Sequence, residues 1–172
     1  LRIKYPNLPI VGIEPALKPA VNNSKDGKIL VMATPMTLKE AKFHKLLDRY
    51  RDKREIEPVP CGGLMEYVEQ GILEGDELDD YLREKLKPFM DSKISSIVLG
   101  CTHYPFVKNA IEKVVGQDVD IIDGSLGTAR ELMRRLKEKD LLNDSKEKGT
   151  IEMINSSNKQ ELIDLSWKLI EM

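Results

Sequence analysis

Two apolar runs without alternation limit what this chain can fold into. Ile29-Leu30-Val31-Met32-Ala33 and Ile97-Val98-Leu99-Gly100 contain no polar residue. A strand with one solvent-exposed face alternates apolar and polar residues, whereas a strand covered on both faces does not. Longer amphipathic segments separate the runs, a pattern typical of a parallel sheet flanked by helices. The sequence therefore predicts an α/β fold in which both faces of the sheet are covered.

The same patterns predict the order of the elements. We expect strands at residues 10–13, 28–33, 56–60, 94–100, 119–122 and 150–154. Amphipathic spacing predicts helices at residues 35–51, 64–70, 76–93, 104–115, 127–139 and 159–171. The polar stretch 141–149 is expected to be a solvated loop.

Charge and cysteine content exclude several classes of protein. The chain of 172 residues carries 27 basic and 29 acidic residues mixed along its length, so we expect no nucleic-acid or membrane partner. No apolar run reaches the 18 residues of a membrane span, and the first residues lack a secretory signal pattern. Cys61 and Cys101 lack the spacing of a zinc site or a disulfide framework. We expect a cytoplasmic protein in which each cysteine is either a buried apolar residue or a reactive thiol.

Residues that could bind or react with a ligand follow three of the expected strands, at residues 33–37, 60–63 and 100–105. Ligands of open parallel sheets bind outside the carboxyl ends of the strands. Cys101 falls between a buried strand and a helix, where free amides and the helix dipole are expected to lower a thiol pKa. His103 could hydrogen-bond the thiol or return a proton. The alternative is a buried cysteine beside a histidine that only caps a helix.

The other two strand ends supply hydroxyl and carboxylate groups. Thr34 fits a helix N-cap and Thr37 the third helical position, and together with free amides they could hold a carboxylate. Spacing alone favours the alternative that Thr34 only caps its helix. Glu66 and Glu69 lie three residues apart on a short helix, so one could face a pocket, although both could be solvated.

Four segments together resemble the glutamate racemases of the aspartate/glutamate racemase superfamily. They are Pro9-Ile10-Val11-Gly12-Ile13-Glu14-Pro15, Ala33-Thr34-Pro35-Met36-Thr37, Leu99-Gly100-Cys101-Thr102-His103-Tyr104-Pro105 and Ile122-Asp123-Gly124-Ser125. The resemblance covers nearly the whole chain, and the segment around Cys101 is its most specific part. It implies the family's parallel-sheet, three-layer α/β domain at residues 9–123. It also implies that residues 124–172 belong to a second, incomplete α/β domain.

The resemblance also implies a reaction and its residues. Glutamate racemases interconvert L- and D-glutamate for peptidoglycan synthesis, without cofactor or metal, by proton transfer between two cysteines on opposite faces of the substrate. The acid/base roles would fall to Cys101, His103 and Glu69, and the substrate-binding roles to Thr34, Thr37 and Thr102. Glu14 is expected to be structural, the substrate to be glutamate, and a homodimer is compatible with the family.

Two family motifs are missing from this sequence. The Asp-Ser-Gly and Cys-Asn-Thr motifs, which supply an aspartate and the other cysteine, do not occur. Cys61 cannot replace that cysteine, because it matches a non-catalytic position. We therefore expect a fragment that is inactive alone. Alternatives are an aspartate or hydantoin racemase, or a non-catalytic amino-acid-binding remnant. A cysteine hydrolase is less favoured, because Cys101 and His103 lack an evident third partner.

Overall fold

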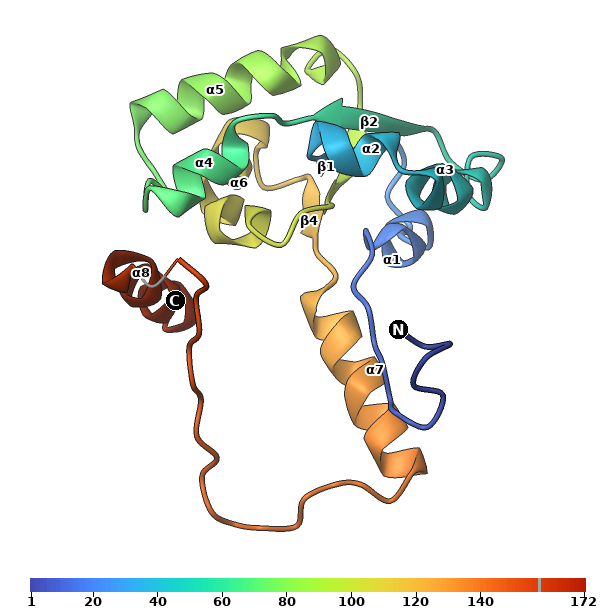
Figure 1. Ribbon diagram of the computed structural model, residues 1–172. Helices are drawn as coiled ribbons and strands as arrows, with labels where there is room; N and C mark the ends of the chain where they lie inside the picture. Colours follow the sequence, from blue (N-terminus) through green and yellow to red (C-terminus); the bar gives the residue numbers. More distant parts are fainter. Residues whose placement is uncertain (158) are drawn as a thin grey trace.

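A parallel four-stranded sheet forms the centre of the computed structural model, which describes residues 1–157 and 159–172 (Figure 1). The strands are β1 (Lys28–Ala33), β2 (Ile56–Pro60), β3 (Ile94–Leu99) and β4 (Asp120–Ile122). Their order across the sheet is β2-β1-β3-β4, and all neighbouring pairs are parallel. The α/β prediction and these four strands are confirmed.

Helices cover both faces of this sheet, as expected for strands without an alternation of apolar and polar residues. On one face, Leu30 and Met32 pack with α4 (Leu64–Glu69), α5 (Asp76–Leu86) and α6 (Lys108–Val115). On the other face, Ile29 and Val31 pack with α1 (Leu17–Val21) and α3 (Ala41–Asp48). Figure 1 shows the first group to the left of the sheet and the second to the right. Adjacent β1 residues thus enter opposite cores, which explains why residues 29–33 include no polar side chain.

The register of the strands brings three chain turns to one edge of the sheet. Ala33 pairs with Pro60, and Met32 pairs with Leu99, so β1, β2 and β3 end at nearly the same level. Thr34, Cys61 and the turn containing Cys101 therefore lie at the same edge. This confirms the predicted common placement of the three strand ends.

Two expected strands do not form. Residues 10–13 and 150–154 have no strand structure, and neither segment pairs with another strand in the described part of the chain. Ile13, Ile151 and Ile154 are exposed. A strand is stabilised by its ladder of hydrogen bonds, so a β-patterned segment without a partner stays irregular.

Helix boundaries also differ from the sequence expectation. The helix expected at residues 35–51 is divided into α2 (Pro35–Lys39) and α3, because Glu40 has an extended backbone (ψ 134°). This break redirects the chain so that Phe43 and Leu46 of α3 reach the core, whereas α2 buries no residue. The helix α1 was not predicted. The helices expected at 76–93 and 104–115 contain 3₁₀ turns, η1 (Lys87–Phe89) and η2 (Tyr104–Val107).

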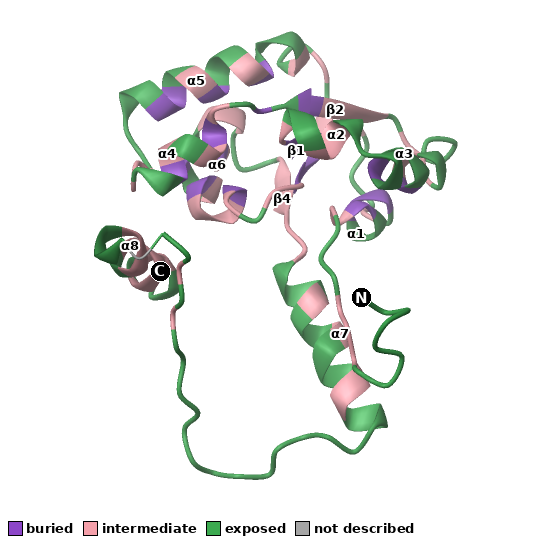
Figure 2. Cartoon of the chain, in the orientation of Figure 1, coloured by how far each residue is buried: buried purple, intermediate pink, exposed green. Residues whose placement is uncertain are grey.

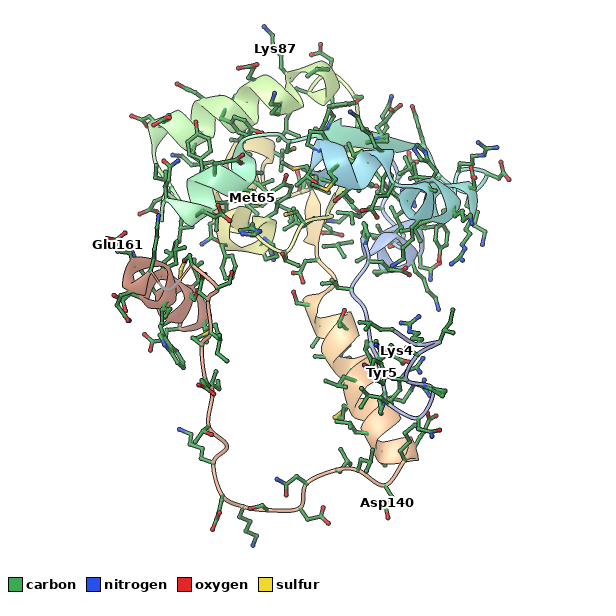
Figure 3. The ribbon with its side chains drawn as sticks, in the orientation of Figure 1. Lys4, Tyr5, Met65, Lys87, Asp140 and Glu161 are labelled. Carbon is green, nitrogen blue, oxygen red and sulfur yellow. The ribbon has the colours of Figure 1, made fainter. Side chains whose placement is uncertain are left out.

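The C-terminal part of the chain has no core of its own. Neither α7 (Ser125–Glu138) nor α8 (Gln160–Ile170) contains a buried residue (Figure 2). The N-terminal segment, where Figure 3 labels Lys4 and Tyr5, runs beside α7, and Lys139 Nζ donates to Asn7 O at 3.3 Å. The connection from α7 to α8 is exposed for most of its length, and residues 141–149 form the expected loop. None of the described helices has the length and apolar character needed to cross a membrane.

Two leucines on amphipathic helices should differ sharply in their contribution to stability. Leu82 of α5 is fully buried, so Leu82→Ala should lower the free energy of unfolding by about 2–5 kcal/mol, because it leaves a cavity. Leu132 of α7 is 42% exposed, and Leu132→Ala should lower the free energy of unfolding by less than about 1 kcal/mol. Urea unfolding followed by circular dichroism measures both. Equal losses would mean that α7 is packed in solution.

Candidate active site

Gly100 allows the backbone that follows β3 to pass close to the end of β1 before the Cys101 turn. Its amide donates to Met32 O at 2.8 Å, which continues the sheet one residue beyond the strand. A Cβ atom at Gly100 would lie 3.0 Å from Ala33 Cβ and 3.1 Å from Met32 O. These contacts are tighter than side chains ordinarily make, so a Cβ at this position would require the end of β1 to shift by a few tenths of an ångström. Glycine therefore keeps the half-buried Cys101 close to the end of β1.

His103 contacts both Cys101 and Glu69, one with each ring nitrogen. Cys101 Sγ is 3.8 Å from His103 Nδ1, and His103 Nε2 is 3.4 Å from Glu69 Oε1. The His103 side chain is 30% exposed and that of Glu69 52%. The residue pattern alone left Glu66 and Glu69 open, and the resemblance gave the acid/base role to Glu69. The fold places Glu69 at the end of α4, beside the Cys101 turn.

The predicted lowering of the Cys101 pKa is wrong. Burial raises the pKa of this thiol above its ordinary value, and the nearby Glu69 carboxylate adds to the increase. Hydrogen bonds from the amides of His103, Tyr104 and Thr102 act in the opposite direction but do not outweigh burial. The amides are present where the sequence placed them. Sequence alone did not give the extent to which the thiol is removed from water.

Cys61 is a different kind of cysteine. It is fully buried, its thiol donates to Val59 O at 3.4 Å, and burial raises its pKa to about 12. Neither cysteine forms a disulfide. Cys61 therefore behaves as a small apolar residue of the core.

The threonines at the end of β1 form a short hydrogen-bonded pair. Thr34 Oγ1 accepts from the amide of Thr37 at 3.2 Å and lies 3.0 Å from Thr37 Oγ1. Thr34 thus caps α2, as its alternative reading predicted, and reaches the site only through Thr37. Thr37 itself lines a cavity together with Cys101 and Thr102.

This cavity of about 250 Å³ is the open space beside the thiol. Its walls come from four parts of the chain, and its other lining residues are Ile13, Glu14, Pro15, Glu40, Lys42, Phe43, Leu46, Leu99, Gly100, Pro105, Asp123, Gly124 and Ser125. His103 and Glu69 approach Cys101 from outside this set. Sequence reasoning missed Glu40 and Lys42 and regarded Glu14 as structural. No local pattern distinguished them from solvated charges, because only the break at Glu40 and the crossing of residues 13–15 bring them to the cavity.

Residues 1–157 and 159–172 contain no set of three or more histidine, cysteine, aspartate or glutamate side chains arranged around a common point, as a metal site would need.

Alkylation should separate the two thiols. Iodoacetamide should modify Cys101 before Cys61, because Cys101 is half exposed and Cys61 is buried with a pKa near 12. The thiolate is the reactive form, so the Cys101 rate should still rise above the ordinary thiol pKa of about 8.5. Peptide mass spectrometry at several pH values measures both rates, with the urea-unfolded chain as the control. Equal rates in the folded protein would contradict the site.

Known proteins resemble this chain both in sequence and in fold. No protein-family model matches the chain. A curated glutamate racemase of Clostridium perfringens (strain ATCC 13124) is 54% identical over 172 residues, which are 100% of this chain and 66% of the relative. A solved glutamate racemase from Francisella tularensis, in complex with D-glutamate, gives a TM-score of 0.73 at 26% identity, covering 91% of this chain and 57% of that one. An isoform from Bacillus anthracis gives 0.69 at 31% identity, covering 80% and 52%.

The chain thus spans about 66% of the length of the curated relatives that it matches. The match to the Clostridium perfringens relative runs along the whole of this chain, and the α/β fold with its parallel sheet matches that of the solved relatives. By sequence and by fold, this chain belongs to the glutamate racemase family.

Proposed function

We propose that this chain supplies one half of a racemase site that interconverts L- and D-glutamate through proton transfer at the α-carbon. The observation that carries the proposal is the line from Cys101 through His103 to Glu69, beside a cavity with threonine hydroxyls on its wall. A group that takes a proton from carbon must be a base within reach of the substrate, backed by a partner that can restore its protonation state.

Cys101 is suited to removing the α-proton. The burial that raises its pKa also makes its thiolate a stronger base, which helps against a weakly acidic C–H bond. His103 can take the thiol proton, and Glu69 stabilises the imidazolium that results. The amides of Thr102, His103 and Tyr104 support the thiolate. Removal of the proton leaves a planar carbanion, which must receive a proton on its other face for inversion.

The base for the other face lies outside this chain in the proposal. Cys61 is the only other cysteine, and it is buried in the core with its thiol bonded to Val59 O. We infer that the second thiol belongs to the third of the relatives' length that this chain does not match. In this proposal the chain alone does not interconvert L- and D-glutamate.

The substrate assignment rests on the relatives and on the cavity wall. The Francisella relative was solved with D-glutamate. In this chain, Thr37 and Thr102 offer hydroxyls to a carboxylate. Aspartate or a hydantoin would use the same chemistry with a different side-chain pocket, and a non-catalytic binding domain would use the pocket alone. A homodimer is a further expectation from the family.

We also propose that residues 124–172 belong to a second domain that the remaining third of the relatives would complete. Three features support this: α7 is amphipathic without a buried residue, and residues 10–13 and 150–154 are β-patterned without a partner strand. A polypeptide that supplies further strands could pair with residues 10–13 and 150–154 and cover the apolar side chains of α7. Residues 9–123 then form the complete domain.

Hydrogen exchange tests the domain proposal. Amides of α7 should exchange much faster than those of α5 in this chain, because α5 buries four residues and α7 buries none. Joining the N-terminal third of the Clostridium perfringens relative should slow exchange in α7 and leave α5 unchanged. Protection of α7 equal to that of α5 in the chain alone would contradict the proposal.

Racemisation tests the function in the same joined protein. The joined protein should racemise glutamate in both directions in D₂O with deuterium entering the α position, whereas this chain alone should not. Cys101→Ala should lower turnover by at least about 10²–10⁴-fold, the usual contribution of a positioned acid/base group. Circular dichroism of the amino acid and proton NMR measure the two signals.

Cys61→Ala is the matched control, and it should retain turnover if the joined protein folds. A preference for aspartate would change the substrate assignment and leave the chemistry in place. Near-normal turnover in Cys101→Ala would refute the two-thiol mechanism.

A further inference from the structure

Tyr104 connects the Cys101 turn to the loop that precedes α4. Its side chain is fully buried, and its hydroxyl donates to Cys61 O at 2.8 Å. Tyr104 follows His103 directly in the chain. One residue therefore joins the turn after β3 to the turn after β2, across the end of β1.

The loop that receives this hydrogen bond determines where α4 begins. The Leu64 amide donates to Cys61 O at 3.4 Å, and Gly63 has φ +97°, a conformation that favours glycine. Tyr81 of α5 donates to the next carbonyl, Gly62 O, at 2.9 Å. Two tyrosine hydroxyls thus hold consecutive carbonyls, one from the Cys101 turn and one from α5.

The other end of α4 carries Glu69, so the connections form a closed circuit. From His103 the circuit runs to Tyr104, through the hydrogen bond to Cys61 O, along α4 to Glu69, and back to His103 at 3.4 Å. The helix has six residues and spans roughly 9 Å. A displacement at its start is carried to Glu69, because a short helix moves as a rigid unit.

We propose that Tyr104 is a positioning residue that sets the separation between Glu69 and His103, an inference that rests on the proposed function of Cys101. The hydrogen bond is buried, and its loss leaves Cys61 O with the longer bond from the Leu64 amide, at 3.4 Å, so the loop before α4 loses its link to the Cys101 turn. Tyr81 cannot substitute for it, because Tyr81 ties the loop to α5 and has no link to the Cys101 turn.

The test uses the pH profile of Cys101 alkylation in this chain, which requires no turnover. The Glu69 carboxylate raises the Cys101 pKa, so Glu69→Gln should move the profile to lower pH. Tyr104→Phe keeps the ring and removes the hydroxyl, and it should move the profile in the same direction by no more than Glu69→Gln does, because it acts only through the position of Glu69. In the double variant, Tyr104→Phe should add nothing to Glu69→Gln.

Tyr81→Phe is the matched control and should leave the profile at its wild-type position, because its hydrogen bond to Gly62 O is exposed and water can replace it. If Tyr104→Phe does not fold, Gly63→Ala replaces it, since it disturbs the start of α4 through its positive φ, and Gly62→Ala is its control. Gly63→Ala should also move the profile to lower pH.

A shift in Glu69→Gln with none in Tyr104→Phe would overturn this inference alone, as would additive shifts in the double variant. An unchanged profile in Glu69→Gln would overturn the proposed link from Glu69 to Cys101 and this inference with it. A Cys101 that does not react in the folded wild type would refute the proposed function itself.

Discussion

The pairing of β1 between β2 and β3 is the constraint on which the rest of the structure depends. Each of these strands ends in a turn with different chemistry, and parallel pairing in register brings the three turns to one edge. Neither the threonines, the Cys61 loop nor the Cys101 turn forms a site by itself. The apolar faces of β1, covered by two separate helical layers, hold this arrangement.

Burial and hydrogen bonding act against each other at Cys101. A fully exposed thiol beside three amides would have a low pKa and would be a weak base, whereas a fully buried thiol such as Cys61 would not ionise near neutral pH. Cys101 lies between these limits, half exposed, with His103 near enough to exchange a proton. For proton transfer from carbon, basicity and access are both needed, and the Cys101 turn offers both.

Several segments outside the two cores leave apolar side chains exposed. The helix α7, the N-terminal segment and the connection to α8 expose apolar side chains that the core does not reach, including Leu126, Met133 and Ile154. Only α8 returns to the domain, where Leu169 packs against the core and Leu165 approaches Gly71 at the end of α4. These segments have helical or β patterning without the partner surface that makes such patterning stable.

The sequence by itself determined the α/β class, the four central strands and the position of Cys101 beyond a buried strand, because these depend on local apolar patterns and turn chemistry. Only the tertiary structure decided three other matters. It brought Glu69 within 3.4 Å of His103, a contact that the local pattern of Glu66 and Glu69 could not show. It raised the Cys101 pKa, because desolvation depends on the surrounding chain. It left residues 10–13 and 150–154 irregular, because a strand needs a partner that no local pattern can supply.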